Sequence, residues 1–170
     1  MDDILHHFIP KEILCQIFSK YLSLQDISCF DIAMGNNEKR PVFLELIGSI
    51  ACIWHGDEDR ESCNEEISWL SNRNIKIRYL SVADVVNDET AIRLASFGTY
   101  LHSLALNGNC INDINMMKVA EGCRNIETFS ISGCPDISDT SIIRIAECCP
   151  DIKNLAVTGC DHITDTGIIK

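Results

Sequence analysis

The chain has 170 residues, of which 46% are hydrophobic, and this suits one ordinary globular domain or two small ones. Its 14 lysines and arginines face 25 acids, a net charge of −11, which argues against nucleic-acid and anionic-membrane binding because both need a basic face. No apolar run reaches the roughly 18 residues of a membrane-spanning helix, and the acidic start at Met1 is unlike a secretion signal.

Residues 1–56 are expected to form three short helices. The first begins at Pro10, because proline suits the first turn of a helix, and its apolar residues recur four apart. Ser23 is expected to cap the second helix and Gly35 to end it. The apolar face of the first helix comprises Ile13, Leu14, Ile17 and Phe18.

The third helix is expected to begin at Pro41 and to end at Gly56. Its apolar residues keep helical spacing over this whole stretch. They are Phe43, Leu46, Ile47, Ile50 and Trp54. Helices this short are marginal in isolation, so the three must pack on one another or on a partner.

Residues 57–74 are expected to form an acidic connector and a cap for the segment that follows. Positions 57–66 carry six acids and one base, so we predict a solvated surface segment without a specific role. Trp69 and Leu70 are expected to cover the open end of the first repeat, as a stacked array requires.

Residues 75–170 repeat one apolar pattern, with a period of 25 or 26 residues between the three clearest copies and an internal spacing of 3, 2 and 3. The middle residues alternate, which predicts a short strand with one buried face, and the fourth residue turns back toward the core. The four copies are Ile77, Leu80, Val82 and Val85; Leu101, Leu104, Leu106 and Asn109; Ile126, Phe129, Ile131 and Cys134; and Ile152, Leu155, Val157 and Cys160.

A helix is expected after each strand, because a capping residue and an acid follow it. These starts are Asn87-Asp88, Asn112-Asp113, Ser138-Asp139 and Thr164-Asp165, and two of the helices should end near Cys123 and Cys149. Apolar pairs at helical spacing come next: Ile92 and Ala95, Met117 and Ala120, Ile143 and Ala146. One strand and one helix cannot bury their own apolar faces, so the units must stack.

The segments 134–139 and 160–165 resemble the cysteine-containing class of leucine-rich repeat, which is common in F-box proteins, and the resemblance covers about residues 75–170. It implies an α+β fold, an α/β solenoid of about four strand–helix repeats behind a three-helix unit. By the 26-residue offset, the last helix stops before its expected alanine and cysteine. Either this is a truncated member or it is part of a longer protein, and the strand around 155–157 is expected to have an open edge.

Five dipeptides near the N-terminus resemble the first half of an F-box: Ile9-Pro10, Glu12-Ile13, Ile17-Phe18, Tyr21-Leu22 and Asp26-Ile27. The resemblance implies that residues 1–56 dock on the Skp-type adaptor of a cullin ubiquitin ligase, while the repeats hold a target protein. It places six residues at or near the adaptor: Ile9, Pro10, Ile13, Ile17, Phe18 and Leu22. A helical cap explains the same residues, so a repeat scaffold with no link to ubiquitin is the alternative function.

Strand alternation also predicts which side chains point outward on the concave sheet. These residues are small and mostly neutral, and Tyr79 is the aromatic among them, the type that most often dominates a binding surface. The alternative is a face that is simply solvated. The expected target-binding residues are Tyr79, Ser81, Ser103, Asn107, Thr128, Ser130, Asn154 and Thr158.

The sequence pattern indicates no catalytic, cofactor or metal site. Cys52, His55 and Cys63 supply three plausible zinc ligands, whereas a structural zinc site needs four. No local signature pairs a nucleophile with a base, and no Gly-rich phosphate loop occurs. The ten cysteines, in a chain without a secretion signal, are expected to be reduced, in the cytoplasm or the nucleus. We therefore expect a binding protein and not an enzyme.

Overall fold

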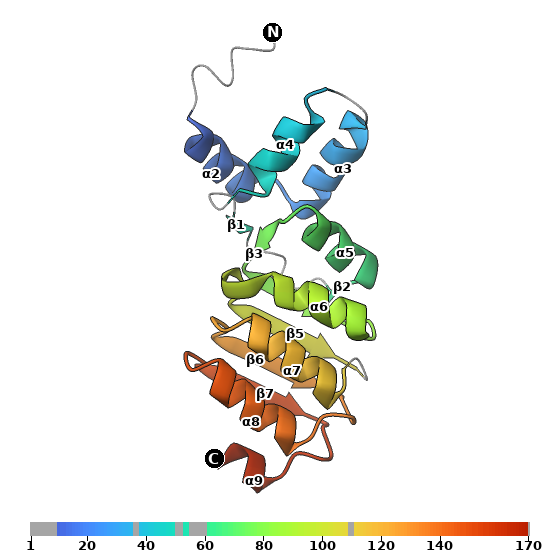
Figure 1. The fold of residues 1–170 in the computed structure, drawn as a ribbon, viewed down its shortest axis with the longest axis vertical. Coiled ribbons are helices and arrows are strands. Elements are labelled where there is room, and N and C mark those ends of the chain that lie inside the picture. Colours follow the sequence, from blue (N-terminus) through green and yellow to red (C-terminus); the bar gives the residue numbers. More distant parts are fainter. Residues whose placement is uncertain (1–9, 36–37, 50–52, 55–60, 109–110, 170) are drawn as a thin grey trace.

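The computed structural model describes residues 10–35, 38–49, 53–54, 61–108 and 111–169. The molecule is elongated, with the N-terminal helices at one end and a stack of strand–helix units extending to the other (Figure 1). Several predicted positions, namely Ile9, Ile50, Cys52, His55, Gly56 and Asn109, together with the side chain of Leu14, lie outside the described residues.

Three helices precede the stack, and strands then alternate with helices. In chain order the elements are α2 (Lys11–Tyr21), α3 (Leu24–Met34), α4 (Arg40–Ile47), β1 (Ile53–Trp54), β2 (Glu61–Ser62), α5 (Asn64–Asn72), β3 (Lys76–Ile77), β4 (Tyr79–Val82), α6 (Asp88–Ser96), the 3₁₀ turn η1 (Gly98–Tyr100), β5 (Ser103–Asn107), α7 (Asp113–Gly122), β6 (Thr128–Ser132), α8 (Asp139–Cys148), β7 (Asn154–Thr158) and α9 (Asp165–Ile168).

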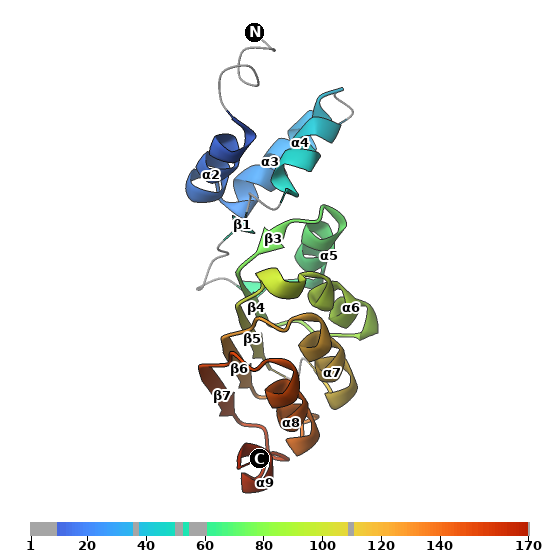
Figure 2. The same ribbon diagram turned by 60° about the vertical axis from the view of Figure 1, so that its left-hand side comes forward.

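The larger sheet is parallel throughout, in the order β2-β4-β5-β6-β7, and its strands pair in the register of the repeat. Leu104 lies opposite Phe129, and Phe129 lies opposite Leu155. The strands line one side of the stack and the helices line the other (Figure 2). Parallel strands need a crossover between them, and here each crossover is one helix of the repeat.

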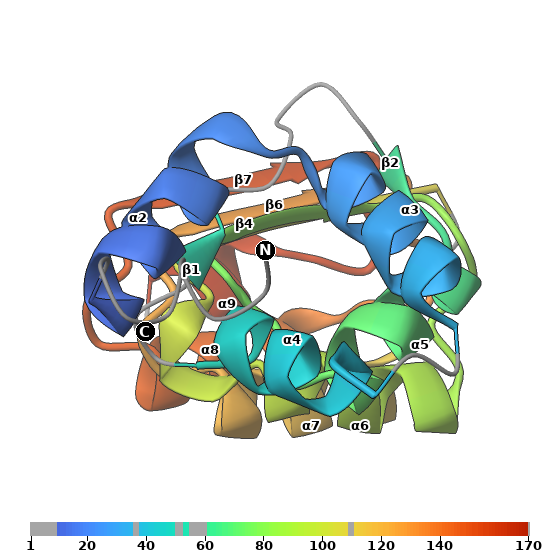
Figure 3. The ribbon, with the colours of Figure 1, turned by 90° about the horizontal axis from the view of Figure 1, so that it is seen from above.

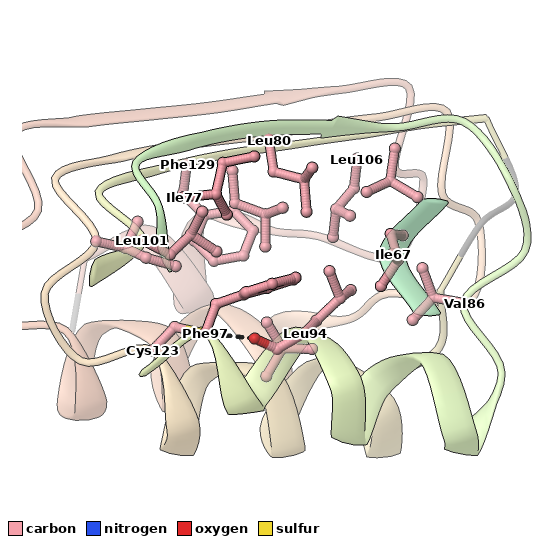
Figure 4. Close-up of a cluster of buried hydrophobic side chains, with 14 of the residues drawn as sticks. Ile67, Ile77, Leu80, Val86, Leu94, Phe97, Leu101, Leu106, Cys123 and Phe129 are labelled. Atoms are coloured by element: carbon pink, nitrogen blue, oxygen red, sulfur yellow. Dashed lines mark hydrogen bonds between the residues drawn. The ribbon is translucent and has the colours of Figure 1, made fainter. Parts of the chain in front are cut away.

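The core lies between these two layers. Leu80, Leu106 and Phe129 point from the strands toward Leu94 and Phe97 on the helix side (Figure 4), and all five are at most 3% exposed. The thiols of the repeat help to satisfy buried carbonyls, as expected of a small apolar side chain with a weak donor. Cys123 donates to the carbonyl of Leu94 at 3.2 Å, and Cys134 donates to that of Ser132 at 3.6 Å.

The predicted helix starts are confirmed. Ser23 forms a capping box with Asp26, and Gly35 ends α3 with a positive φ of 43°. The side chains of Asn87, Asn112, Ser138 and Thr164 each accept a hydrogen bond from a backbone N–H in the first turn of the following helix. Each cap satisfies an otherwise unpaired donor, so the cap fixes where the helix begins.

The predicted third helix is wrong in its second half. Helix α4 ends at Gly48, whose N–H donates to the carbonyl of Leu44. A Cβ at Gly48 would lie 2.7 Å from the carbonyl oxygen of Arg73, so glycine is required where the end of α4 meets the first strand–helix unit. Trp54 lies in β1 and pairs with Ile77 of β3; its helical spacing from Phe43 is coincidental.

The predicted connector has regular secondary structure in its second half, although Glu61 and Glu65 are exposed, as expected of a solvated charged run. Glu61 and Ser62 form the edge strand β2, which pairs with β4, and Ser62 is 8% exposed. Helix α5 then begins at Asn64 and buries Leu70 completely, with Trp69 partly buried against the same core. The charged run therefore extends into the first strand–helix unit. This is possible because Glu61 lies in a two-residue edge strand, where its side chain can point into solvent.

The helix faces differ by one residue from the apolar pairs noted in the sequence. Ile92 is 62% exposed and Ala146 is exposed, whereas Ala120 is buried as expected. The buried pairs are Ala91 and Leu94, Met116 and Val119, Ile142 and Ile145. In each helix the buried pair stands four and seven places after the capping residue. The position of the cap therefore determines which helix face turns toward the core. Val85 is likewise 64% exposed, and Val86 fills the core in its place.

Two substitutions at one repeat position test the stacking. Phe129 is fully buried, so Phe129→Ala is expected to lower the free energy of unfolding by about 3–5 kcal/mol. Leu155 occupies the same position one repeat later but is 40% exposed, so Leu155→Ala is expected to cost about 1 kcal/mol or less. Urea unfolding of both variants measures the difference. Equal losses would contradict a core that is closed around β6 and open at β7.

Candidate interaction surfaces

The structure divides the residues predicted to contact the adaptor into two groups. Ile13 and Ile17 are 47% and 41% exposed on α2, and Pro10 is exposed at its start. Phe18 and Leu22 are half-buried and pack against the core of the molecule. Large apolar side chains that remain open to solvent on one helix face are typical of contact with another protein.

Further apolar side chains on the same three helices are exposed, and no pattern in the sequence singles them out. Figure 3 looks along the stack from its N-terminal end and shows α2, α3 and α4 in front of the strand–helix units. The rings of Phe30 and Phe43 are 6.3 Å apart and join α3 to α4. The exposed residues are Tyr21 at 70%, Phe30 at 54%, Ile32 at 74% and Val42 at 49%.

A buried carboxylate holds these helices on the repeats. Asp31 of α3 is 1% exposed and accepts hydrogen bonds from Nε of Arg40 at 2.8 Å and Nε of Arg73 at 2.6 Å. Burial alone would raise the pKa of Asp31, but the two guanidinium groups outweigh burial and lower it. Since Arg73 follows α5, this ion-pair network connects the N-terminal unit to the first unit of the stack.

The predicted target-binding residues do line the outward side of the sheet, with one exception. Tyr79, Ser103, Asn107, Thr128 and Ser130 are half-buried. Asn154 and Thr158 on the last strand are exposed. Ser81 is only 5% exposed, so its side chain is mostly withdrawn from solvent. Its hydroxyl accepts a hydrogen bond from Asn107 at 3.4 Å, and the same amide group reaches Glu61 at 3.0 Å.

A cavity of about 760 Å³ opens at the upper end of this face, between the α2–α3 corner and β4. Lys20, Tyr21, Trp54 and Tyr79 are among its lining residues. Trp54 is 2% exposed, and its indole N–H has no hydrogen-bond partner in the described part of the chain. A buried donor without a partner costs free energy, so an acceptor placed in this cavity would be stabilising.

A charged residue or a histidine directly precedes each of the strands β4, β5, β6 and β7, and these four residues form a column that continues to Trp54 at the end of β1. The backbone N–H of Arg78 donates to the carbonyl of Trp54, that of His102 to Arg78, that of Glu127 to His102 and that of Lys153 to Glu127, at 2.7–2.9 Å. The repeat period identifies these residues in the sequence, as the ones directly before each expected strand. The sequence does not show that their side chains lie next to one another beside the sheet face.

Carboxylates also link successive repeats on the opposite edge of the sheet. Asp113 accepts hydrogen bonds from the backbone N–H and hydroxyl of Ser138, at 2.9 and 2.6 Å, and from the hydroxyl of Ser141. Asp139 receives the same two bonds from Thr164, at 2.7 and 2.6 Å. Asp113 and Asp139 therefore each hold the capping residue of the next helix, a role that the sequence pattern did not indicate.

The described cysteines are free thiols, as expected. Burial raises the pKa of Cys123 to about 12 and that of Cys149 to about 11, and such neutral thiols are poor nucleophiles and poor metal ligands. Within the described ranges, no group of three potential metal ligands comes together, and Cys63 is exposed at the start of α5. None of the described helices combines the length and the apolar character needed to span a membrane.

A comparison with protein families identifies the central unit. A family model described as Leucine Rich repeat matches residues 99–120, which contain β5 and most of α7. Residues 99–120 are therefore similar to a leucine-rich repeat. Because β4, β6 and β7 continue the same parallel register on both sides, the chain carries an α/β solenoid of leucine-rich-repeat type behind its N-terminal helices. No curated protein matches the chain.

Replacing Asp113 with asparagine tests the link between repeats. Burial acts to raise the pKa of Asp113, but the hydrogen bonds from Ser138 and Ser141 dominate and lower it. A lowered folded-state pKa gives stability that is complete above the unfolded value of about 4 and is lost as the pH falls through the folded value. Asp113→Asn is expected to lower the free energy of unfolding at pH 7 by about 1–3 kcal/mol.

The same variant is expected to lose less stability than the wild type when the pH falls from about 5 toward 3, because its side chain no longer titrates. Urea unfolding at a series of pH values measures both effects. Asp136→Asn, at an exposed acid in the loop that leads to Ser138, is the matched control and should leave both unchanged. Equal pH profiles for Asp113→Asn and the wild type would show that this carboxylate does not stabilise the stack.

Proposed function

We propose that this chain is a non-catalytic substrate-recognition subunit of a Skp–cullin–F-box type ubiquitin ligase. The observation that carries the proposal is the exposure of Ile13 and Ile17 on α2. Both residues belong to the dipeptides that resemble an F-box, and an apolar face left open at those positions is what docking on an adaptor requires. The leucine-rich-repeat solenoid would then present the target.

The proposal gives the chain no chemical step of its own. The N-terminal helices would bind the Skp-type adaptor, the solenoid would bind a target protein, and other subunits would transfer ubiquitin. The gain is proximity, since holding two reactants together raises the rate of their reaction. The expected location is the cytoplasm or the nucleus, where the reduced cysteines of this chain are stable.

A second candidate is a leucine-rich-repeat scaffold that binds another protein without any link to ubiquitin. It needs only the repeat that the family model matches and the ion pairs of Asp31, which make the N-terminal helices an attached cap. The two candidates differ in one property, binding to the adaptor, and this property can be measured directly.

Adaptor binding by the purified chain is the deciding experiment. The wild type is expected to form a complex with a purified Skp-type adaptor in calorimetric titration, and Ile13→Asp plus Ile17→Asp to weaken it at least tenfold, because two buried charges would face an apolar partner. Ile92→Asp, at a 62% exposed isoleucine on α6, is the matched control and should bind normally.

Thermal unfolding of each variant ensures that a loss of binding is not a loss of folding. Absence of a complex with the wild type, or a complex that the double variant forms equally well, would reject the F-box proposal. The scaffold without a link to ubiquitin would then be the better description of the chain.

A further inference from the structure

The charges of the repeat region are segregated between the two edges of the sheet. Parallel strands place all their starts at one edge and all their ends at the other. The segments 73–78, 97–102, 122–127 and 148–153, which precede strands, contain the bases Arg73, Lys76, Arg78, Arg124 and Lys153 and the acids Glu127 and Asp151. The segments 83–88, 111–113, 133–139 and 159–165, which follow strands, contain Asp84, Asp88, Asp113, Asp136, Asp139, Asp161 and Asp165 and neither lysine nor arginine.

The acidic edge has a structural explanation, and part of the basic edge has none. Four of the acids lie in the first turns of α6, α7, α8 and α9, where they complement the helix dipole. Arg78 and Lys153 lie outside the helices, at the starts of β4 and β7. Both are exposed, and Arg78 forms no ion pair with the described residues.

The side chains at the strand starts interact electrostatically with one another. Lys153 forms an ion pair with Glu127 at 2.8 Å. The pKa of Glu127 is lowered first by that hydrogen bond and charge, and also by the charges of His102 and Arg78. These four side chains therefore share one electrostatic neighbourhood, in which positive charge predominates although the whole chain carries −11.

We propose that this column, Arg78, His102, Glu127 and Lys153, binds a short acidic segment of a target protein, which enters the neighbouring cavity at its upper end. The column spans three strand spacings, about 14 Å, and about four residues of extended peptide cover that distance. Trp54 stands in the same backbone ladder, and its unpartnered indole N–H supplies a donor for a carbonyl or carboxylate of the segment.

The chemistry of the site favours a peptide over a nucleic acid. The positive charge is confined to a few side chains of a chain with a net charge of −11, whereas nucleic-acid binding needs an extended basic face. The half-buried lining residue Tyr79 also offers an apolar surface for one side chain of the peptide. The inference deepens the target-binding half of the proposed function and does not depend on the adaptor.

Selection from a random library of 12-residue peptides displayed on phage, with the full chain immobilised, tests the proposal. The enriched peptides are expected to contain clustered Asp and Glu residues. For the best of them, made synthetically, Arg78→Glu plus Lys153→Glu should weaken binding in fluorescence anisotropy at least tenfold. Lys118→Glu plus Arg144→Glu, on α7 and α8 of the helix layer, makes the same change of net charge and should alter binding less than about threefold.

Trp54→Phe keeps an aromatic ring but removes the indole donor, so it should weaken the peptide about three- to tenfold, while Trp69→Phe should not. Any of three results would overturn the proposal. The selected peptides could be no more acidic than the library, the two charge-reversal variants could bind the peptide equally well, or a labelled 12-residue polyuridylate could bind more tightly than the peptide. Adaptor binding should be unchanged by Arg78→Glu plus Lys153→Glu. Failure of this site and failure of the F-box proposal are therefore separate results.

Discussion

The structure depends on the inability of one strand–helix unit to bury its own apolar face. A unit of about 25 residues has one short strand and one short helix, and its core is closed only when the next unit lies in register against it. Phe129 is fully buried because β5 and β7 flank β6, whereas Leu155 on the last described strand is 40% exposed. Burial thus follows position in the stack and not the hydrophobicity of the residue.

Polar contacts repeat with the same period and keep the units in register. Asp113 and Asp139 each hold the capping residue of the following helix, and the thiol of Cys149 donates to the carbonyl of Cys123 at 3.3 Å. These bonds connect residues 25 to 28 positions apart, which is one repeat. At the other end, Asp31 plays a corresponding part by joining α3 to the residue that follows α5.

The two candidate surfaces are separate, and this separation suits a protein that joins two partners. The apolar residues Ile13 and Ile17 lie on α2, at one end of the elongated molecule, while the charged column runs along the sheet side of the solenoid. An apolar helical face and a small, mainly positive strip select partners of different chemistry. The cavity beneath the α2–α3 corner lies between them and is lined by residues of both parts.

Features with local causes could be predicted from the residues alone. The repeat period gave the strands β5, β6 and β7, the capping residues gave the start of each repeat helix, and the F-box-like dipeptides pointed to residues of α2 that are now seen exposed. Alternation along the strands also gave most of the outward side of the sheet, although it did not show that Ser81 is covered.

Tertiary structure alone decided the features that depend on neighbours far apart in the chain. Residue 48, at the end of α4, has to be glycine because the carbonyl of Arg73 approaches it, and Glu61 joins the sheet because β4 offers it an edge. The column of Arg78, His102 and Lys153 exists because parallel strands bring one position of each repeat into contact. Periodicity in the sequence determines whether a residue lies in a strand or a helix of its own unit. Stacking determines which residues of different units meet, because those contacts join residues about 25 positions apart.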